Sequence, residues 1–291
     1  MSFRSIVFTS SATSFARTTL SYSASSTRSA NCGGTSFART LSRSASSTSA
    51  PRGGALIVGA GEGIGKSLVT RFKTEGYIVG ASRRTTGGLN FLSSSLDRSY
   101  DGFDARKEED VEKMFDDFSK ACDNNIEVVV FNIGANIKYP ILETTKRKFE
   151  KCWEMACLSG FLVGRSAASH MLSKHAPTGT IIFTGATASL RGSSHFSAFS
   201  VAKGGLRQLS QSMSRELHPK GIHVAHVVID GAVDSPFIRE HFKDLIAKAP
   251  THAIVDPDEI AHNYVHLHEQ TLRGRSCWTH EMDLRPSLEK W

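Results

Sequence analysis

The stretch Gly54-Ala-Leu-Ile-Val-Gly-Ala-Gly-Glu-Gly-Ile-Gly65 decides the fold, because it joins a short apolar run to closely spaced glycines. The apolar run, residues 55–58, predicts a buried strand, and the apolar spacing after Lys66 is that of a helix. The glycines therefore fall on a turn from strand to helix, where backbone N–H groups and the helix N-terminus can hold a phosphate. The residues expected to bind the pyrophosphate of a dinucleotide are Gly59, Glu62, Gly63, Ile64 and Gly65.

Apolar runs and helical patterns alternate along the rest of the chain. The predicted strands are residues 55–58, 77–81, 127–132, 180–184, 223–229 and, as a closing edge strand, 277–284; the predicted helices are 66–75, 108–121, 147–172, 199–217 and 257–269. Strands that are apolar on both faces and separated by helices indicate a parallel sheet with helices on each side. We therefore predict a doubly wound parallel α/β sheet, the Rossmann fold, in a single domain. Ligands of such sheets bind at the carboxyl ends of the strands, so Gly59, Asn132 and Thr184 should share one crevice.

The end of the second predicted strand indicates which dinucleotide binds. An acidic residue about twenty positions after the first glycine usually holds a free ribose, but residues 76–96 contain no Asp or Glu. The strand is instead followed by Ser82, Arg83 and Arg84, which offer a hydroxyl and two guanidinium groups to a 2′-phosphate. We therefore expect NADP(H) rather than NAD(H), with solvated surface arginines as the alternative.

Two later segments point to a family. Thr180-Ile-Ile-Phe-Thr-Gly-Ala-Thr-Ala-Ser-Leu190 and Phe199-Ser-Val-Ala-Lys-Gly-Gly-Leu206, with Phe131-Asn-Ile-Gly134, resemble the classical short-chain dehydrogenase/reductase family over residues 53–291. The resemblance implies an oxidoreductase that acts on a small molecule and forms a homo-oligomer, a dimer or tetramer. The further cofactor contacts that it implies are Asp104 and Ala105 at the adenine, Asn132 and Gly134 along the ribose, Lys203 at the nicotinamide ribose and Val233 near the nicotinamide amide.

Three of the four catalytic positions depart from the family pattern. The family's Tyr-x-x-x-Lys aligns with Phe199 and Lys203, its Ser aligns with Ala186, and its Asn aligns with Cys157. Phe199 cannot exchange a proton, and general acid–base assistance is typically worth about 10²- to 10⁴-fold. The candidates to replace the phenol are the nearby residues Thr187, Ser189, His195, Ser197 and Ser200. His195 is chemically the most attractive of them, and the alternative is that it is an exposed loop histidine.

These departures leave two functional hypotheses open. The first is an NADP(H)-dependent oxidoreductase with an atypical active site, acting on a carbonyl, an alcohol or an activated alkene. The second is a catalytically silent NADP(H)-binding sensor or scaffold. Turnover of any such substrate separates the two.

The composition bounds the remaining possibilities. The 291 residues, 40% of them apolar, suffice for one large α/β domain, and no apolar stretch has the length of a membrane span. The five cysteines form no C-x-x-C pair, which is typical of free thiols in a reducing compartment. The spacing of His262, His266 and His268 indicates a solvent-exposed helix face rather than a zinc site, so no metal is expected.

The N-terminal segment, residues 1–52, accounts for the basic charge. Six arginines precede the first acidic residue, Glu62, and the chain beyond them is nearly neutral, so the net charge of +7 does not indicate a nucleic-acid partner. The segment is rich in Ser, Thr and Ala, and it repeats Thr-Ser-Phe-Ala-Arg at Thr13 and Thr35. It therefore resembles a disordered organelle transit peptide, mitochondrial rather than plastid; if it is only a disordered tail, the protein is cytoplasmic.

Overall fold

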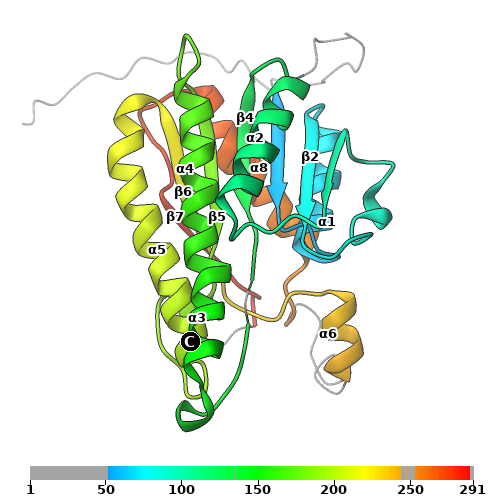
Figure 1. Cartoon of the computed structure of the whole chain (residues 1–291), viewed down its shortest axis with the longest axis vertical. Coiled ribbons are helices and arrows are strands. Elements are labelled where there is room, and N and C mark those ends of the chain that lie inside the picture. The colour runs from blue at the N-terminus through cyan, green and yellow to red at the C-terminus, as the bar shows by residue number, and fades with distance from the viewer. Residues whose placement is uncertain (1–51, 135, 244–246, 248–252, 289–291) are drawn as a thin grey trace, which may run out of the picture. The chain divides into compact units, whose positions relative to one another are not determined.

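The apolar run before the glycines forms strand β1, Gly54–Val58, which is entirely buried. The computed structural model describes residues 52–134, 136–243, 247 and 253–288, so most of the predicted N-terminal segment lies outside the described residues. Seven parallel strands have the order β3-β2-β1-β4-β5-β6-β7 (Figure 1). The other strands are β2 Ile78–Arg83, β3 Arg98–Asp101, β4 Ile126–Phe131, β5 Gly179–Thr184, β6 Ile222–Ile229 and β7 Glu281–Leu284.

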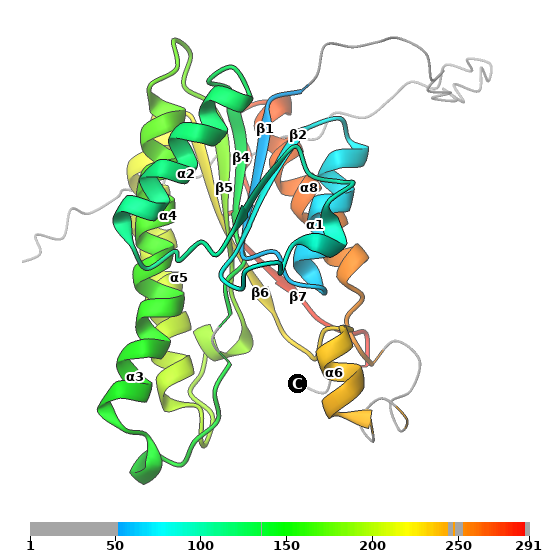
Figure 2. The same cartoon turned by 45° about the vertical axis from the view of Figure 1, so that its right-hand side comes forward.

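Helices cover both faces of the sheet, which lies between two helical layers in Figure 2. One layer is α1 Ile64–Thr74 and α8 Pro257–Arg273; the other is α2 Glu108–Ala121, α4 Ser159–Leu172 and α5 Ser197–Leu217. Because side chains alternate along a strand, Leu56 of β1 joins the core under α2 and α4, whereas Ile57 joins the core under α1 and α8. The prediction of a doubly wound parallel sheet in a single domain is confirmed.

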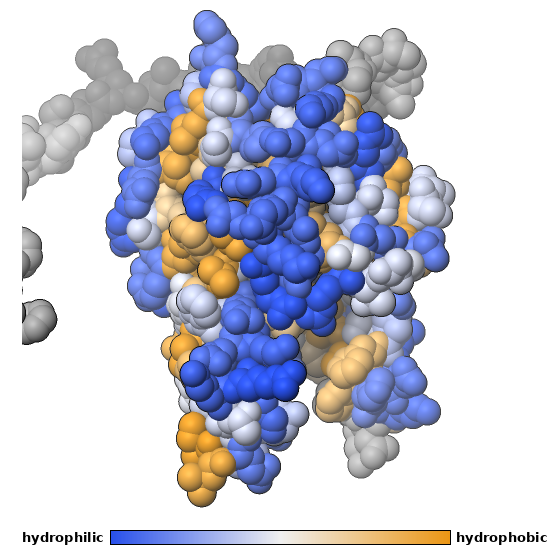
Figure 3. Space-filling model, in the orientation of Figure 1, coloured by the Kyte–Doolittle hydropathy of each residue, from blue (hydrophilic) through white to orange (hydrophobic). Residues whose placement is uncertain are grey.

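Two helices extend past the carboxyl ends of the strands. The predicted helix 147–172 consists of three consecutive parts without a break: α3 Lys146–Trp153, a π-helical stretch Glu154–Leu158, and α4. A short helix that the sequence did not predict, α6 Pro236–His241, lies on the opposite side of the strand ends (Figure 2). The space-filling view shows a hollow between these two parts (Figure 3). Short 3₁₀ turns occur at Asn90–Leu92, Ile141–Glu143, Thr187–Ser189 and His218–Lys220.

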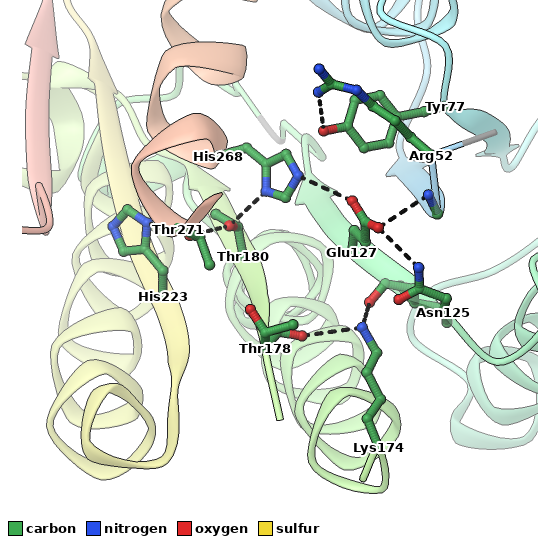
Figure 4. A network of polar contacts seen from close by, with 12 residues as sticks. Arg52, Tyr77, Asn125, Glu127, Lys174, Thr178, Thr180, His223, His268 and Thr271 are labelled. Carbon is green, nitrogen blue, oxygen red and sulfur yellow. Dashed lines mark hydrogen bonds and ion pairs between the residues drawn. The ribbon is translucent and has the colours of Figure 1, made fainter. Parts of the chain in front are cut away.

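A buried polar network anchors α8 at the opposite, amino-terminal edge of the sheet (Figure 4). His268 of α8 is 1% exposed, and its Nδ1 lies 2.8 Å from the Thr180 hydroxyl of β5. The carboxylate of Glu127 accepts hydrogen bonds from Gly53 N and Asn125 Nδ2, at 3.1 and 2.9 Å, and lies 3.8 Å from His268 Nε2. These groups pair with one another far from the glycine turn, which indicates a structural role. None of the described helices is long and apolar enough to cross a membrane.

Candidate functional site

The turn between β1 and α1 has the geometry that the glycines require. Gly59 has a φ of +95°, and a Cβ there would lie 2.8 Å from Ile133 Cγ1. A Cβ at Gly65 would lie only 2.5 Å from the Cα of Ala60, so only glycine lets the helix start so close to the strand. Helix α1 has no side-chain cap and no acidic residue in its first turn. No side chain therefore competes with an anion for the N–H groups at the start of the helix.

A first cavity, of about 240 Å³, lies at the ends of β1, β2 and β4. Predicted cofactor residues that line it are Gly59, Ser82, Arg83, Arg84, Asp104, Ala105, Asn132 and Gly134. The Ser82 hydroxyl is buried and has no hydrogen-bond partner among the described residues. Arg106 binds both oxygens of Asp104, with its Nη2 at 2.6 Å from Oδ2, and this hydrogen bonding lowers the pKa of Asp104.

The two arginines at this cavity differ in their surroundings. Arg83 donates from Nη1 to the carbonyl of Gly88 at 2.7 Å and lies 3.9 Å from the Glu62 carboxylate. Arg84 is exposed, and its guanidinium lies 3.7 Å from the sulfur of Met155. Glu62, which was predicted among the cofactor contacts, is exposed and does not line this cavity. Arg84 therefore has fewer protein partners than Arg83.

A second cavity, of about 370 Å³, shares Gly59, Gly61 and the β4 end with the first and continues along the strand ends. The remaining predicted cofactor residues that line it are Gly63, Ile64, Gly65, Lys203 and Val233. Lys203 is 2% exposed, and its Nζ donates to the carbonyls of Thr184 and Ile133 at 2.8 and 3.1 Å. Burial lowers the pKa of Lys203 to about 8. Two of the three N–H bonds of the ammonium are used in this way, so one remains for a ligand.

Phe199 and Ala186 lie in the same cavity as Lys203. The Phe199 ring is 8% exposed and packs in a small apolar cluster with Cys152 and Ala202. Cys157 lies apart from them, on the π-helical stretch, with its sulfur against Gly205 of α5, and it lines none of the described cavities of the cleft. Burial raises the pKa of Cys157, which disfavours the reactive thiolate.

A third cavity, of about 320 Å³, adjoins the second and has a polar wall. The two share Ala186, Phe199, Ile229 and Gly231. The polar wall contains Thr187, whose hydroxyl donates to Asp230, and Asp230 also pairs with Arg285 Nη1 at 2.9 Å. The pairing with Arg285 was not predicted.

The other proton-donor candidates have different places. Ser189 donates to the Ala186 carbonyl at 2.6 Å, and His195 is exposed with a φ of +69° and lines none of the described cavities of the cleft. The hydroxyls of Ser197 and Ser200 are buried without a partner in the described part of the chain, and only Ser200 lines the third cavity. Of the five candidates, Thr187 and Ser200 line the third cavity.

The histidines of α8 are engaged separately. His262 Nε2 lies 2.6 Å from Arg71 Nη1, and His266 Nε2 lies 3.3 Å from Gln270. Among the described residues, no three His, Cys, Asp or Glu side chains come together as metal ligands.

Comparisons with known proteins identify relatives of this chain. The family profile of short chain dehydrogenases matches residues 54–245. The crystal structure of a short-chain dehydrogenase from Rhodopseudomonas palustris has 42% sequence identity and a TM-score of 0.67, over 81% of this chain and 100% of that chain. A short-chain dehydrogenase/reductase of Armillaria gallica is 28% identical over 201 residues, 66% of this chain and 75% of that protein. An actinorhodin polyketide ketoreductase variant solved with NADPH has a TM-score of 0.70 at 22% identity, over 82% of this chain and 98% of that chain, and shows the fold alone.

Proposed function

The chain belongs to the short-chain dehydrogenase family, whose members are oxidoreductases, and from this premise we propose that it is an NADP(H)-dependent oxidoreductase with an atypical active site. Its substrate is a small or medium carbonyl, alcohol or activated alkene. The observation that carries the proposal is the cleft that runs from Arg84, past the glycine turn, to Lys203.

The residues of this cleft fit a dinucleotide with a 2′-phosphate. Gly59 and Gly65 place no side chain at the two close approaches of the turn, so a pyrophosphate can approach the N-terminus of α1. The unpartnered Ser82 hydroxyl and the exposed Arg84 guanidinium offer hydrogen bonds to the 2′-phosphate. The ketoreductase of the same fold, whose structure contains NADPH, provides a precedent for this cofactor.

Each part of the cleft has a distinct task in the proposed reaction. The bound nicotinamide would supply or accept a hydride. The third N–H of Lys203 would hold the ribose next to it, because the carbonyls of Thr184 and Ile133 fix the ammonium. Phe199 and Ala186 line the cavity beside Lys203 with apolar side chains, and they offer no hydroxyl to the substrate oxygen. The proton must therefore come from another group.

Cofactor titration tests the binding half of the proposal. We expect NADPH to bind the purified chain, with a change in nicotinamide fluorescence, and the double variant Arg83→Ala/Arg84→Ala to lose at least about tenfold in affinity. NADH affinity should change little in the same variant. No binding at millimolar NADPH, or a wild-type preference for NADH, contradicts the NADP(H) assignment.

A turnover screen tests the catalytic half. Carbonyl, enoyl and alcohol substrates are offered with NADPH or NADP⁺, and absorbance reports the cofactor's redox state. Turnover of any of them excludes a silent sensor or scaffold. Binding of NADPH without turnover of any substrate in the panel contradicts the enzymatic proposal.

We also propose that residues 1–52 direct import into mitochondria, since they combine arginines with Ser and Thr and contain no acidic residue. A fusion of these residues to a fluorescent protein should localise to mitochondria. Localisation to plastids or to the cytosol contradicts this proposal.

A further inference from the structure

A hydrogen-bonded chain of three side chains crosses the wall of the third cavity. Thr187 follows β5, Asp230 follows β6, and Arg285 follows β7, so the ends of three adjacent strands bring them together. The Thr187 hydroxyl donates to one oxygen of Asp230, and Arg285 donates to the other at 2.9 Å. Thr187 and Asp230 line the cavity beside Phe199 and Ala186.

The charges around Asp230 are not balanced by Arg285 alone. Arg285 is shared between two carboxylates, because its Nε also lies 2.9 Å from the carboxylate of Asp283. Two carboxylates and one guanidinium give the group a formal charge of about −1. Asp230 is only 7% exposed, so water competes little for its oxygens. Its partners therefore hold this carboxylate in place at the cavity wall.

The orientation of Thr187 links this carboxylate to the cavity. A hydroxyl has one hydrogen to donate and two lone pairs that accept, and the hydrogen of Thr187 is directed at Asp230. The lone pairs are therefore left for a donor in the cavity. Asn136, Ser193 and Ser200 also line the cavity, but within the described part of the chain none of them donates a hydrogen bond to a carboxylate that could take up a proton.

We propose that Thr187 and Asp230 form a proton relay that replaces the missing phenol, and that the substrate is a secondary alcohol oxidised with NADP⁺. The substrate's C–H bond breaks, and the hydrogen leaves with the bonding electron pair as hydride, which bound NADP⁺ would accept. The hydroxyl proton of the substrate passes to Thr187 Oγ1, while the proton of Thr187 passes to Asp230. The alcohol becomes a ketone, and Asp230 later releases the proton to solvent.

This inference rests on the proposed function and adds a substrate class and two residues to it. Thr187 is the catalytic residue, and Asp230 acts through it.

A binding experiment tests the contact without relying on turnover. With NADPH bound, an alcohol cannot react, so fluorine NMR line broadening of trifluoroisopropanol reports binding alone. Thr187→Val removes the acceptor and should weaken this binding at least about threefold, whereas Thr187→Ser keeps the hydroxyl and should retain it. Thr74→Val is the matched control, because the Thr74 hydroxyl donates to the backbone of the exposed end of α1.

A kinetic experiment tests the relay itself on the full chain with NADP⁺ and a panel of secondary alcohols that includes isopropanol and cyclohexanol. Thr187→Val and Asp230→Asn should each lower kcat by about 100-fold or more, the lower range of general acid–base effects. Thr187→Ser should restore most of the rate, and the KM for NADP⁺ should stay within about threefold, because neither residue holds the cofactor. In Asp230→Asn, Arg285 retains its pairing with Asp283, so the variant is expected to fold.

The outcomes separate the relay from the proposed function. Wild-type protein that binds NADPH but oxidises none of the alcohols overturns the relay and leaves the cofactor assignment in place. Equal rates in Thr187→Val and wild type, or in Asp230→Asn and wild type, also overturn it. Failure of the wild type to bind NADPH removes the proposed function, and the relay with it.

Discussion

At the scale of single residues, Arg83 and Arg84 show how neighbours in sequence acquire different roles. Arg83 is the last residue of β2, and its guanidinium is partly used by the Gly88 carbonyl and the Glu62 carboxylate. Arg84 follows the strand and is exposed beside Met155 at the mouth of the first cavity. The sequence presents the two as equivalent, whereas the structure does not.

This difference leads to a prediction for the single variants. Arg84→Ala should weaken NADPH binding about tenfold, because a charge-assisted hydrogen bond is typically worth about 1.5–3 kcal/mol. Arg83→Ala should cost clearly less, since that guanidinium already has partners. Fluorescence titration with NADPH, and with NADH as the matched control ligand, measures both. A larger loss in Arg83→Ala than in Arg84→Ala would assign the phosphate to the other arginine.

Phe199 supports a second prediction at the residue scale. Its ring lies in the same cavity as Lys203 and Ala186, so a hydroxyl added there would enter the site. The double variant Phe199→Tyr/Ala186→Ser should therefore raise carbonyl reduction by about 10²-fold, the lower range for general acid assistance. NADPH oxidation with a panel of ketones is the measurement. No gain in a double variant that still binds NADPH would contradict this prediction.

At the scale of elements, the turn from β1 to α1 is where a side chain is least tolerated. Gly65→Ala should lower stability by about 1–3 kcal/mol, because its Cβ would overlap the Ala60 backbone and overpacking costs about that much. Gly61→Ala is the control in the same turn, since its Cβ would meet no atom within 4 Å. Thermal unfolding without cofactor compares the two. Equal melting temperatures for both variants would mean that α1 can move away from β1.

Elements also show where reasoning from sequence was incomplete. Helix α2 was predicted with the bounds that the structure gives, because its charged first turn and regular apolar spacing are strong local signals. β3 was not predicted, since its residues, Arg98–Asp101, are mostly exposed and form no apolar run. The π-helical stretch Glu154–Leu158 was read as ordinary helix, because one inserted residue hardly changes the hydrophobic period.

At the scale of the whole molecule, buried histidines make stability depend on pH. His223 and His226 lie inside β6 with no exposed surface, and burial lowers the pKa of each from 6.5 to about 4. The unfolded chain therefore binds protons that the folded chain does not bind. The stabilisation from these neutral imidazoles is present above pH 6.5 and is lost as the pH falls toward 4.

We predict that the urea midpoint falls steadily between pH 6.5 and 4, with an uptake of about two protons on unfolding from these histidines. His226→Gln should reduce that uptake by about one proton, because it removes one of the two imidazoles. Glu281 keeps its pairing with Arg207 in the variant. Urea unfolding at several pH values measures the slope. A midpoint that does not change over this range would mean that the imidazoles are protonated in the folded state.

The sequence by itself determined the sheet, its helical layers and the position of the crevice, because hydrophobic periodicity and glycine conformation act locally. It also determined which side chains stand at the catalytic positions. The tertiary structure alone decided which residues meet across the crevice: Arg84 has fewer protein partners than Arg83, Cys157 faces Gly205, and Asp230 joins Thr187 to Arg285. The reason is physical, since contacts between residues far apart in the chain depend on how strands align and helices pack, and no local pattern encodes them.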